Sequence, residues 1–282
     1  MSGTAWAHGA EATGGITPRL EVLVPLLALA GLYALGWSRL SQRPLAARRP
    51  AFMLIGSLAL VVALLSPLDQ WADQLFSFHM VQHMLLIAVA APALLLADPF
   101  PAVVWALPRT WRLAGRRVIV RGSAFGRAWR AVTGTTAAWI VFAGVLWGWH
   151  LPAAYDGALS HRWLHDLEHL CFFAAALSFW WPVIHPAPRF RRAPPYPTRV
   201  VYLVLGAFQT AALGLSITLA PTILYRSYTA AGALEDQTRG GVVMWALGGA
   251  VDMLAVLVLV YATLGSDSRT APTVDADEVY RN

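Results

Sequence analysis

The chain alternates between long apolar segments and short polar ones, and this alternation predicts its architecture. A helix that crosses the hydrocarbon core of a bilayer needs about 20 mostly apolar residues. Seven segments reach or approach this length: 20–38, 51–66, 75–97, 135–150, 164–184, 199–220 and 241–264. We therefore predict an all-α fold, an integral membrane bundle of seven transmembrane helices.

Arginine is unevenly distributed among the polar segments that separate these helices. Alternate segments hold 17 of the 21 basic residues, all of which are arginine. The basic segments are 39–50, 98–134, 185–198 with Arg199, and the C-terminal tail. Because cytoplasmic segments carry an excess of basic residues, we predict the N-terminus outside the membrane and the C-terminus in the cytoplasm.

The same pattern divides the chain into three parts. Residues 1–19 are predicted to form an extracytoplasmic tail, residues 20–264 the membrane domain, and residues 265–282 a mobile cytoplasmic tail. We expect no signal peptide, because the first 18 residues lack an apolar core. The Arg-rich loop 98–134 is expected in the cytoplasm, either as a plain basic loop or with a helix lying on the inner leaflet.

Composition supports a membrane protein and excludes several classes of function. The chain is 57% hydrophobic and only 13% charged, which is unlike an ordinary soluble domain. The topology accounts for the net charge of +6, so nucleic-acid binding is not expected. Without lysine or a glycine-rich phosphate loop, neither nucleotide hydrolysis nor Schiff-base chemistry is expected. The single cysteine, Cys171, excludes a disulfide framework and a CxxC metal site.

Histidines with helical spacing occur in two of the predicted helices. His79 and His83 lie in the outer half of the third helix, and residues four apart share a helix face. His161, His165 and His169 repeat this spacing at the start of the fifth helix. Neutral imidazole is a ligand for copper, zinc and iron. Two histidine stripes at one depth therefore predict a metal site in the outer half of the bundle.

The other histidines and the acidic residues reinforce this one-sided distribution. His150 ends the fourth helix at the outer face and His8 lies in the outer tail, so only His185 of the eight histidines is predicted on the cytoplasmic side. Acidic residues at the same outer level are Asp69, Asp73, Asp156, Asp166 and Glu168. The titratable side chains are thus predicted to gather at one end of the bundle.

Two methionines and one buried aspartate are weaker candidates. Met80 and Met84 offer thioethers, which favour cuprous ion, but they lie about 100° around the helix from the histidines, so core packing explains them as well. Asp252 lies inside the seventh helix, where an ionisable residue is a functional candidate by default. It could instead pair with a histidine or form a hydrogen bond with the backbone of a broken helix.

Three segments resemble the CtaG-type family of cytochrome c oxidase assembly proteins. They are SPLDQWADQLFSFHMVQHMLL (66–86), HLPAAYDGALSHRWLHDLEHL (150–170) and DQTRGGVVMWALGGAVDM (236–253). The paired HMVQHM is the most specific part, and the resemblance extends over about residues 20–264. It implies a bacterial multi-helix membrane protein associated with copper insertion into haem–copper oxidases. The family pattern maps onto His79, Met80, His83, Met84, His150, His161, His165, Glu168, His169, Asp236, Gln237 and Asp252.

We therefore predict a copper-binding assembly factor, not an enzyme, in the bacterial cytoplasmic membrane. It would hold copper, with cuprous ion favoured and zinc as the alternative, at the extracytoplasmic side and deliver it to a haem–copper oxidase subunit in the same membrane. The predicted ligands are His79, His83, His165 and His169, with His150, His161, Met80 and Met84 as an outer set that passes the ion. Asp252 and Glu168 would orient the imidazoles and balance charge.

Other classes of function remain open on the residues alone. Histidines four apart with nearby carboxylates also suit a membrane zinc hydrolase or a di-iron oxygenase, in which metal-bound water or oxygen reacts. Histidines from facing helices can also bind haem b. A transporter is less favoured, because no polar path continues to the cytoplasmic side and His185 alone does not make one.

Overall fold

The structure is a computed structural model in which every regular element is an α-helix or a π-helix. It describes residues 19–40, 48–118 and 123–270. The predicted all-α class is confirmed for these residues. His8 and most of both predicted tails lie outside the described residues.

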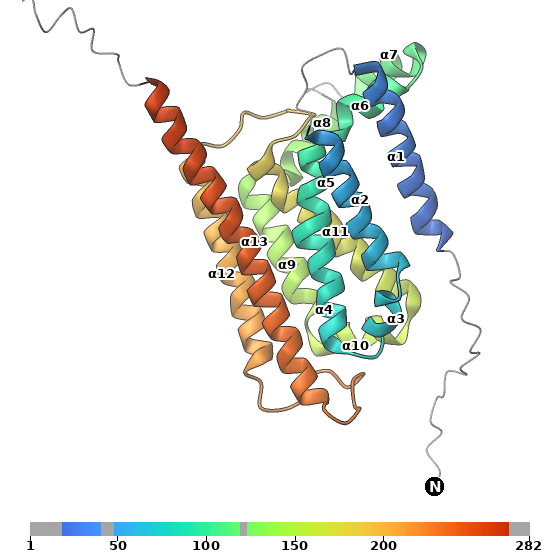
Figure 1. Cartoon of the computed structure of the whole chain (residues 1–282), viewed down its shortest axis with the longest axis vertical. Helices are drawn as coiled ribbons and strands as arrows, with labels where there is room; N and C mark the ends of the chain where they lie inside the picture. Colours follow the sequence, from blue (N-terminus) through green and yellow to red (C-terminus); the bar gives the residue numbers. More distant parts are fainter. Residues whose placement is uncertain (1–18, 41–47, 119–122, 271–282) are drawn as a thin grey trace, which may run out of the picture.

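The long helices form a bundle and run along a common direction (Figure 1). In chain order the described helices are α1 Leu20–Leu40, α2 Arg49–Leu65, α3 Leu68–Ala72, α4 Phe76–Met84, the π-helix η1 Leu85–Ala90, α5 Ala91–Ala97, α6 Pro99–Ala106, α7 Arg109–Val118, α8 Ala124–Val132, α9 Thr135–Trp149, α10 Pro152–Ser160, α11 Arg162–Ile184, α12 Tyr196–Thr218 and α13 Ala233–Thr270. The last helix continues six residues beyond the predicted boundary at residue 264.

Several described helices are long and apolar enough to cross a membrane. The five that meet this condition are Leu20–Leu40, Phe76–Ala97, Arg162–Ile184, Tyr196–Thr218 and Ala233–Leu264. A sixth results if α8 and α9, which are bent by 66° relative to each other, form one span. The chain is therefore a multi-pass membrane protein. The seven predicted spans exceed even the count of six, because α2 has only 17 residues, whereas a bilayer needs about 20.

The Arg-rich segment 98–134 is not a plain loop in the structure. It contains the short helices α6, α7 and α8, and both α7 and α8 are strongly amphipathic. Asp98 separates α5 from α6 in a left-handed backbone conformation with φ of 48°. Its buried carboxylate accepts a hydrogen bond from the Ala187 backbone N–H and pairs with Arg49. The segment therefore contains helices, as the second predicted alternative requires, and the place of such a helix on the inner leaflet stays a prediction.

The helices that carry the predicted metal ligands lie inside the bundle. In the apolar stretch of the Phe76–Ala97 span 67% of the residues are buried, whereas in that of α1 only 11% are. α11 packs against α9, α5 and η1, and α4 packs against α13. Because α4 and α11 are surrounded by other helices, polar side chains at their facing positions are shielded from solvent and lipid.

The α4–α5 span contains a π-helical turn directly after its histidine pair. Pro92 lacks a backbone N–H, so an α-helix could not continue regularly through it. The wider turn of η1 accommodates this residue, and the Trp180 indole N–H donates to the Ile87 carbonyl at 3.0 Å. Turns of this kind interrupt helices mostly near functional sites.

Two contacts fix the start of α4 against α13. Asp236 accepts hydrogen bonds from the backbone N–H and the hydroxyl of Ser77. Its carboxylate thus pairs with one of the backbone N–H groups that have no partner within the first turn of α4. Gly240 lies so close to the Phe76 ring that a Cβ atom at this position would overlap it. The DQTRGG segment that carries the family resemblance therefore positions α4.

Candidate metal centre

Side chains from α4 and α11 converge in one buried cluster. His79 and His83 point the same way from α4, and their Nε2 atoms are 2.9 Å apart. From α11, the His165 ring lies 5.0 Å from the His79 ring, and the His169 ring lies 5.4 Å from the His83 ring. The predicted pairing of two histidine stripes at one depth is therefore present in the structure.

Glu168 lies between the two histidine pairs. One carboxylate oxygen is 3.8 Å from His79 Nε2, and the other is 3.8 Å from His83 Nε2. The Glu168 side chain has no exposed surface. At these distances the Glu168 carboxylate faces the same space as the imidazoles, so it is within reach of a bound ion. Its predicted role, to orient the imidazoles and balance charge, stays a prediction.

Many donor atoms of the cluster have no hydrogen-bond partner among the described residues. They are His83 Nδ1, His165 Nε2, both ring nitrogens of His169, both Glu168 oxygens and, beside the cluster, His150 Nε2. Buried polar side-chain atoms in proteins are almost always paired, because an unpaired one costs about 1–3 kcal/mol. So many unpaired atoms in one place indicate a site built for a ligand.

The spacing of these atoms fits a metal ion. Two ligand atoms about 2.0–2.1 Å from a tetrahedral ion are roughly 3.3 Å apart. The observed separations of 2.9 and 3.8 Å bracket this value. Two overlapping groups have all their ligand atoms within 4.8 Å of one another: His79, His83 and His169, and His79, His165 and Glu168. Nitrogen and carboxylate donors of this kind suit copper, zinc or iron.

A hydrogen-bond chain sets the tautomer of His79. The Tyr228 hydroxyl donates to the Ala72 carbonyl at 2.8 Å, so its oxygen accepts from His79 Nδ1 at 3.2 Å. Tyr155 in turn donates to the Tyr228 oxygen at 3.3 Å. With its proton on Nδ1, His79 presents the lone pair of Nε2 to the cluster. Anchoring of this kind is common behind metal-binding histidines.

His150 lies beside the cluster, and its Nδ1 is held by a hydrogen bond, as that of His79 is. Its ring is 6.2 Å from that of His83, and its Nδ1 donates to the Leu146 carbonyl at 2.7 Å. With its Nδ1 proton held by this carbonyl, the neutral ring presents the lone pair of Nε2, which has no hydrogen-bond partner among the described residues.

Four other predicted residues lie apart from this cluster. His161 is exposed at the start of α11, where its Nδ1 contacts the Gly157 carbonyl at 3.3 Å. Met80 and Met84 belong to the apolar core and lie against glycines of α13. Asp252 is buried next to a small cavity of about 20 Å³ beside Met84, and within the described chain it makes no ion pair with a histidine.

Three further residues support the site and were not among the predicted site residues. Gln82, which lies between the two histidines in the sequence, is buried and donates to Asp69, and Tyr228 anchors His79. Arg19 pairs with Asp69 and with Asp166, the residue next to His165. Tyr228 lies in the segment between α12 and α13, which has no periodic spacing to identify it. The signal for Gln82 was its place inside the HMVQHM motif.

Comparison with known proteins assigns most of the chain to one family model. The model of the cytochrome c oxidase caa3 assembly factor (Caa3_CtaG) matches residues 31–266. The chain is also 27% identical over 270 residues to the uncharacterized proteins Mb0105 of Mycobacterium bovis and MT0111 of Mycobacterium tuberculosis. These matches cover 90% of this chain but only 40% of each relative, so the chain spans less than half of their length. No solved structure matches.

Proposed function

The chain belongs to the cytochrome c oxidase caa3 assembly factor family, and on this basis we propose that it holds copper and delivers it to an oxidase subunit in the same membrane. The histidine and glutamate cluster would be the binding site, and the copper ion its cargo. The family name connects the chain to oxidase assembly. The chemistry of the donor atoms connects that assembly to a metal.

The observation that carries the proposal is the buried cluster of unpaired donors. His79, His83, His165, His169 and Glu168 form two overlapping groups and together provide more ligand atoms than one ion needs. Most of these residues have ring or carboxylate atoms without a hydrogen-bond partner among the described residues. A carrier must bind its ion and also release it, so it benefits from alternative ligands of similar geometry. A site with a single closed set of four ligands would retain the metal as a structural ion.

We propose seven crossings in the bacterial cytoplasmic membrane, of which α2 with 17 residues and α9 with 15 residues are the short ones. The Arg-rich helices α6 to α8 lie at the end of the bundle opposite α3 and α10, which border the histidine cluster (Figure 1). The positive-inside rule then assigns the histidine end to the extracytoplasmic side. This is the side from which copper would be delivered.

The orientation predicts the behaviour of reporter fusions. Alkaline phosphatase, which is active only outside the cytoplasm, is expected to be active when inserted between α12 and α13 and inactive when fused to the C-terminus. A green fluorescent protein fused to the C-terminus is expected to fluoresce. An active phosphatase at the C-terminus would contradict the proposed topology.

Transfer of copper to an oxidase subunit tests the function directly. The protein, purified in detergent and loaded with cuprous ion, is mixed with a copper-free oxidase subunit, and the metal in each is measured after separation. We expect the subunit to gain copper in proportion to the copper that the protein loses. A matched incubation across a dialysis membrane separates contact-dependent transfer from release into solution. No gain of copper by the subunit, together with normal oxidase assembly in cells that lack the protein, would contradict the proposal.

Glu168 supports a second candidate, a metal-dependent membrane enzyme. Two histidines and one carboxylate, as in the group of His79, His165 and Glu168, also form sites for catalytic zinc and for non-haem iron. Metal analysis separates the two functions. A zinc or iron enzyme would keep about one ion per active site through purification, and the ion would not pass to an oxidase subunit.

A further inference from the structure

A cavity of about 480 Å³ lies beside the histidine cluster, at the same end of the bundle. Three carboxylates line it, from Asp69 and Asp73 at α3 and from Asp166 on α11. Two arginines, Arg19 and Arg162, line it as well. The cavity is therefore strongly charged, and its size leaves room for a hydrated ion or a small complex.

His165 connects this cavity to the cluster. Its side chain lines the cavity, and it also belongs to the group with His79 and Glu168. The residue is 7% exposed, and its Nε2 has no hydrogen-bond partner among the described residues. An acidic cavity alone would not indicate a ligand. An unpaired imidazole that borders both spaces indicates a ligand that passes between them.

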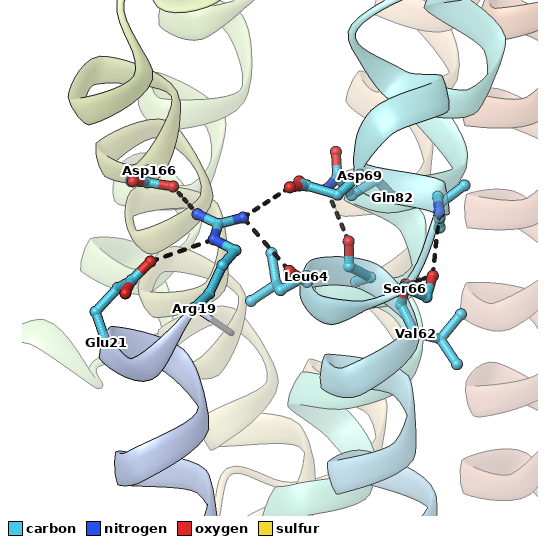
Figure 2. Close-up of polar contacts among 10 residues, drawn as sticks. Arg19, Glu21, Val62, Leu64, Ser66, Asp69, Gln82 and Asp166 are labelled. Carbon is cyan, nitrogen blue, oxygen red and sulfur yellow. Dashed lines mark hydrogen bonds and ion pairs between the residues drawn. The ribbon is translucent and has the colours of Figure 1, made fainter. Parts of the chain in front are cut away.

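Arg19 lines the cavity and ties three helices together. Figure 2 shows its guanidinium between two carboxylates: Nη1 donates to Asp69 at 3.1 Å, and Nη2 pairs with Asp166. Its Nε also donates to Glu21 at 3.4 Å on α1. The Arg19 side chain is only 8% exposed. Although burial by itself lowers the pKa of Arg19, the two aspartates outweigh it and raise that pKa above its ordinary value, so the side chain stays charged.

The same network reaches the histidine-bearing helix α4. The second oxygen of Asp69 accepts from Gln82 Nε2 at 2.8 Å, and Gln82 also donates to the Ala63 carbonyl at 2.7 Å (Figure 2). Gln82 lies next to His83 in the chain, and Asp166 lies next to His165. Arg19 is thus linked to both helices that provide the proposed metal ligands.

We propose that this cavity is the port through which the metal ion enters and leaves the cluster, and that Arg19 is the latch that closes it. The inference rests on the proposed function, since it takes a metal ion as the ligand of the cluster. A cation in the port competes with the guanidinium for Asp69 and Asp166. When the cation replaces Arg19 as the partner of these two aspartates, it gains access to His165.

The two overlapping ligand groups then form successive positions. The group of His79, His165 and Glu168 borders the port. The other group adds His83 and His169, each of which lies about one helical turn further along its helix than His79 and His165. His79 belongs to both groups. An ion can therefore move from the outer to the inner position while it keeps one ligand. Release follows the same path in reverse.

Loading and release rates test the latch. Cuprous ion is supplied as its coloured bicinchoninate complex to the full chain in lipid nanodiscs, and the loss of colour is followed by stopped flow. We expect Arg19→Gln to accelerate both loading and release by about tenfold, because the ion pairs of Arg19 with Asp69 and Asp166 no longer have to be broken before the ion passes. The dissociation constant and the copper stoichiometry should stay within about twofold of wild type, since a latch changes the barrier and not the end states.

Arg162→Gln is the matched control. It removes the same charge from the same cavity, but Arg162 makes no ion pair within the described part of the chain. We expect at most a small, salt-sensitive change in rate. Arg19→Lys keeps the charge and should restore much of the wild-type rate. Equal rates in wild type and Arg19→Gln, or equal acceleration by Arg162→Gln, would overturn the latch.

A chemical plug tests the port without disturbing Arg19. In a Cys171→Ala background, Ser160→Cys places the only thiol at the exposed cavity rim, where a bulky maleimide can be attached. We expect the labelled protein to load at least about tenfold more slowly than the unlabelled protein. Thr229→Cys, in the exposed segment between α12 and α13, is the labelled control and should load normally.

The outcomes separate this inference from the proposed function. If the wild-type protein binds copper but the plug and Arg19→Gln leave all rates unchanged, the port is wrong and the function stands. If the wild-type protein binds no cuprous ion, the proposed function fails and the port fails with it. Slower loading of the plugged protein with an unchanged final stoichiometry supports the port.

Discussion

Replacing His79 or His83 with alanine is expected to weaken copper binding by the purified protein by about 100-fold or more. Even the loss of a residue that only orients a ligand costs about 10–100-fold in metal affinity, so the loss of a ligand should cost at least as much. The Nε2 atoms of these two residues are the closest pair of donors in the cluster, 2.9 Å apart. Competition with a cuprous chelator of known affinity measures the change.

Two other histidines provide matched controls for this experiment. His161 is exposed at the same end of the bundle, and His185 ends α11 at the opposite end, where it contacts the Arg191 carbonyl. His161→Ala and His185→Ala should bind copper as tightly as the wild type. If His79→Ala and His83→Ala also keep wild-type affinity, the ion binds elsewhere and the metal centre is misassigned.

Replacing Glu168 with leucine is expected to stabilise the metal-free protein while weakening metal binding. Both carboxylate oxygens are buried without a hydrogen-bond partner among the described residues, and an unpaired buried polar group costs about 1–3 kcal/mol. Leucine removes that cost at similar volume. We therefore expect the free energy of unfolding of the metal-free protein to rise by about 1–3 kcal/mol.

Unfolding with and without copper measures both effects in one experiment. Copper should stabilise the wild type, by about 2.7 kcal/mol at a free concentration 100 times the dissociation constant, and should stabilise Glu168→Leu much less. Glu235→Leu, at an exposed glutamate that pairs with Arg239, controls for the substitution itself. A metal-free Glu168→Leu protein that is less stable than the wild type would show that Glu168 has a structural role and does not serve a ligand.

The sequence predicts the main features of the fold because lipid imposes simple rules on it. Apolar length located the helices, although α13 begins at Ala233, before its predicted start, because the polar residues that open it are packed against α4. Helical spacing placed His79 and His83 on one face, and it did so for His165 and His169. These predictions depend on local periodicity alone.

The features that the sequence did not predict depend on contacts between distant segments. Tyr228 reaches His79 across 149 positions of the chain, and Arg19 reaches Asp166 across 147. No local pattern encodes either contact. Glu168 was predicted to orient the imidazoles and balance charge, and that role stays a prediction. The contact that brings its carboxylate to the imidazoles joins α11 to α4, so local spacing could not show it. The amphipathic helices of segment 98–134 were predicted only as one of two alternatives.

The position of Glu168 also has an electrostatic consequence for the choice of ion. The cluster combines one carboxylate with imidazoles that bind metals in their neutral form, and it is buried inside the bundle. A monovalent cation next to ionised Glu168 gives an electroneutral centre, whereas a divalent cation leaves one positive charge. Because a net charge is costly in a medium of low dielectric constant, we expect the charge of the centre to favour cuprous ion over zinc, whereas its imidazole and carboxylate donors suit both ions.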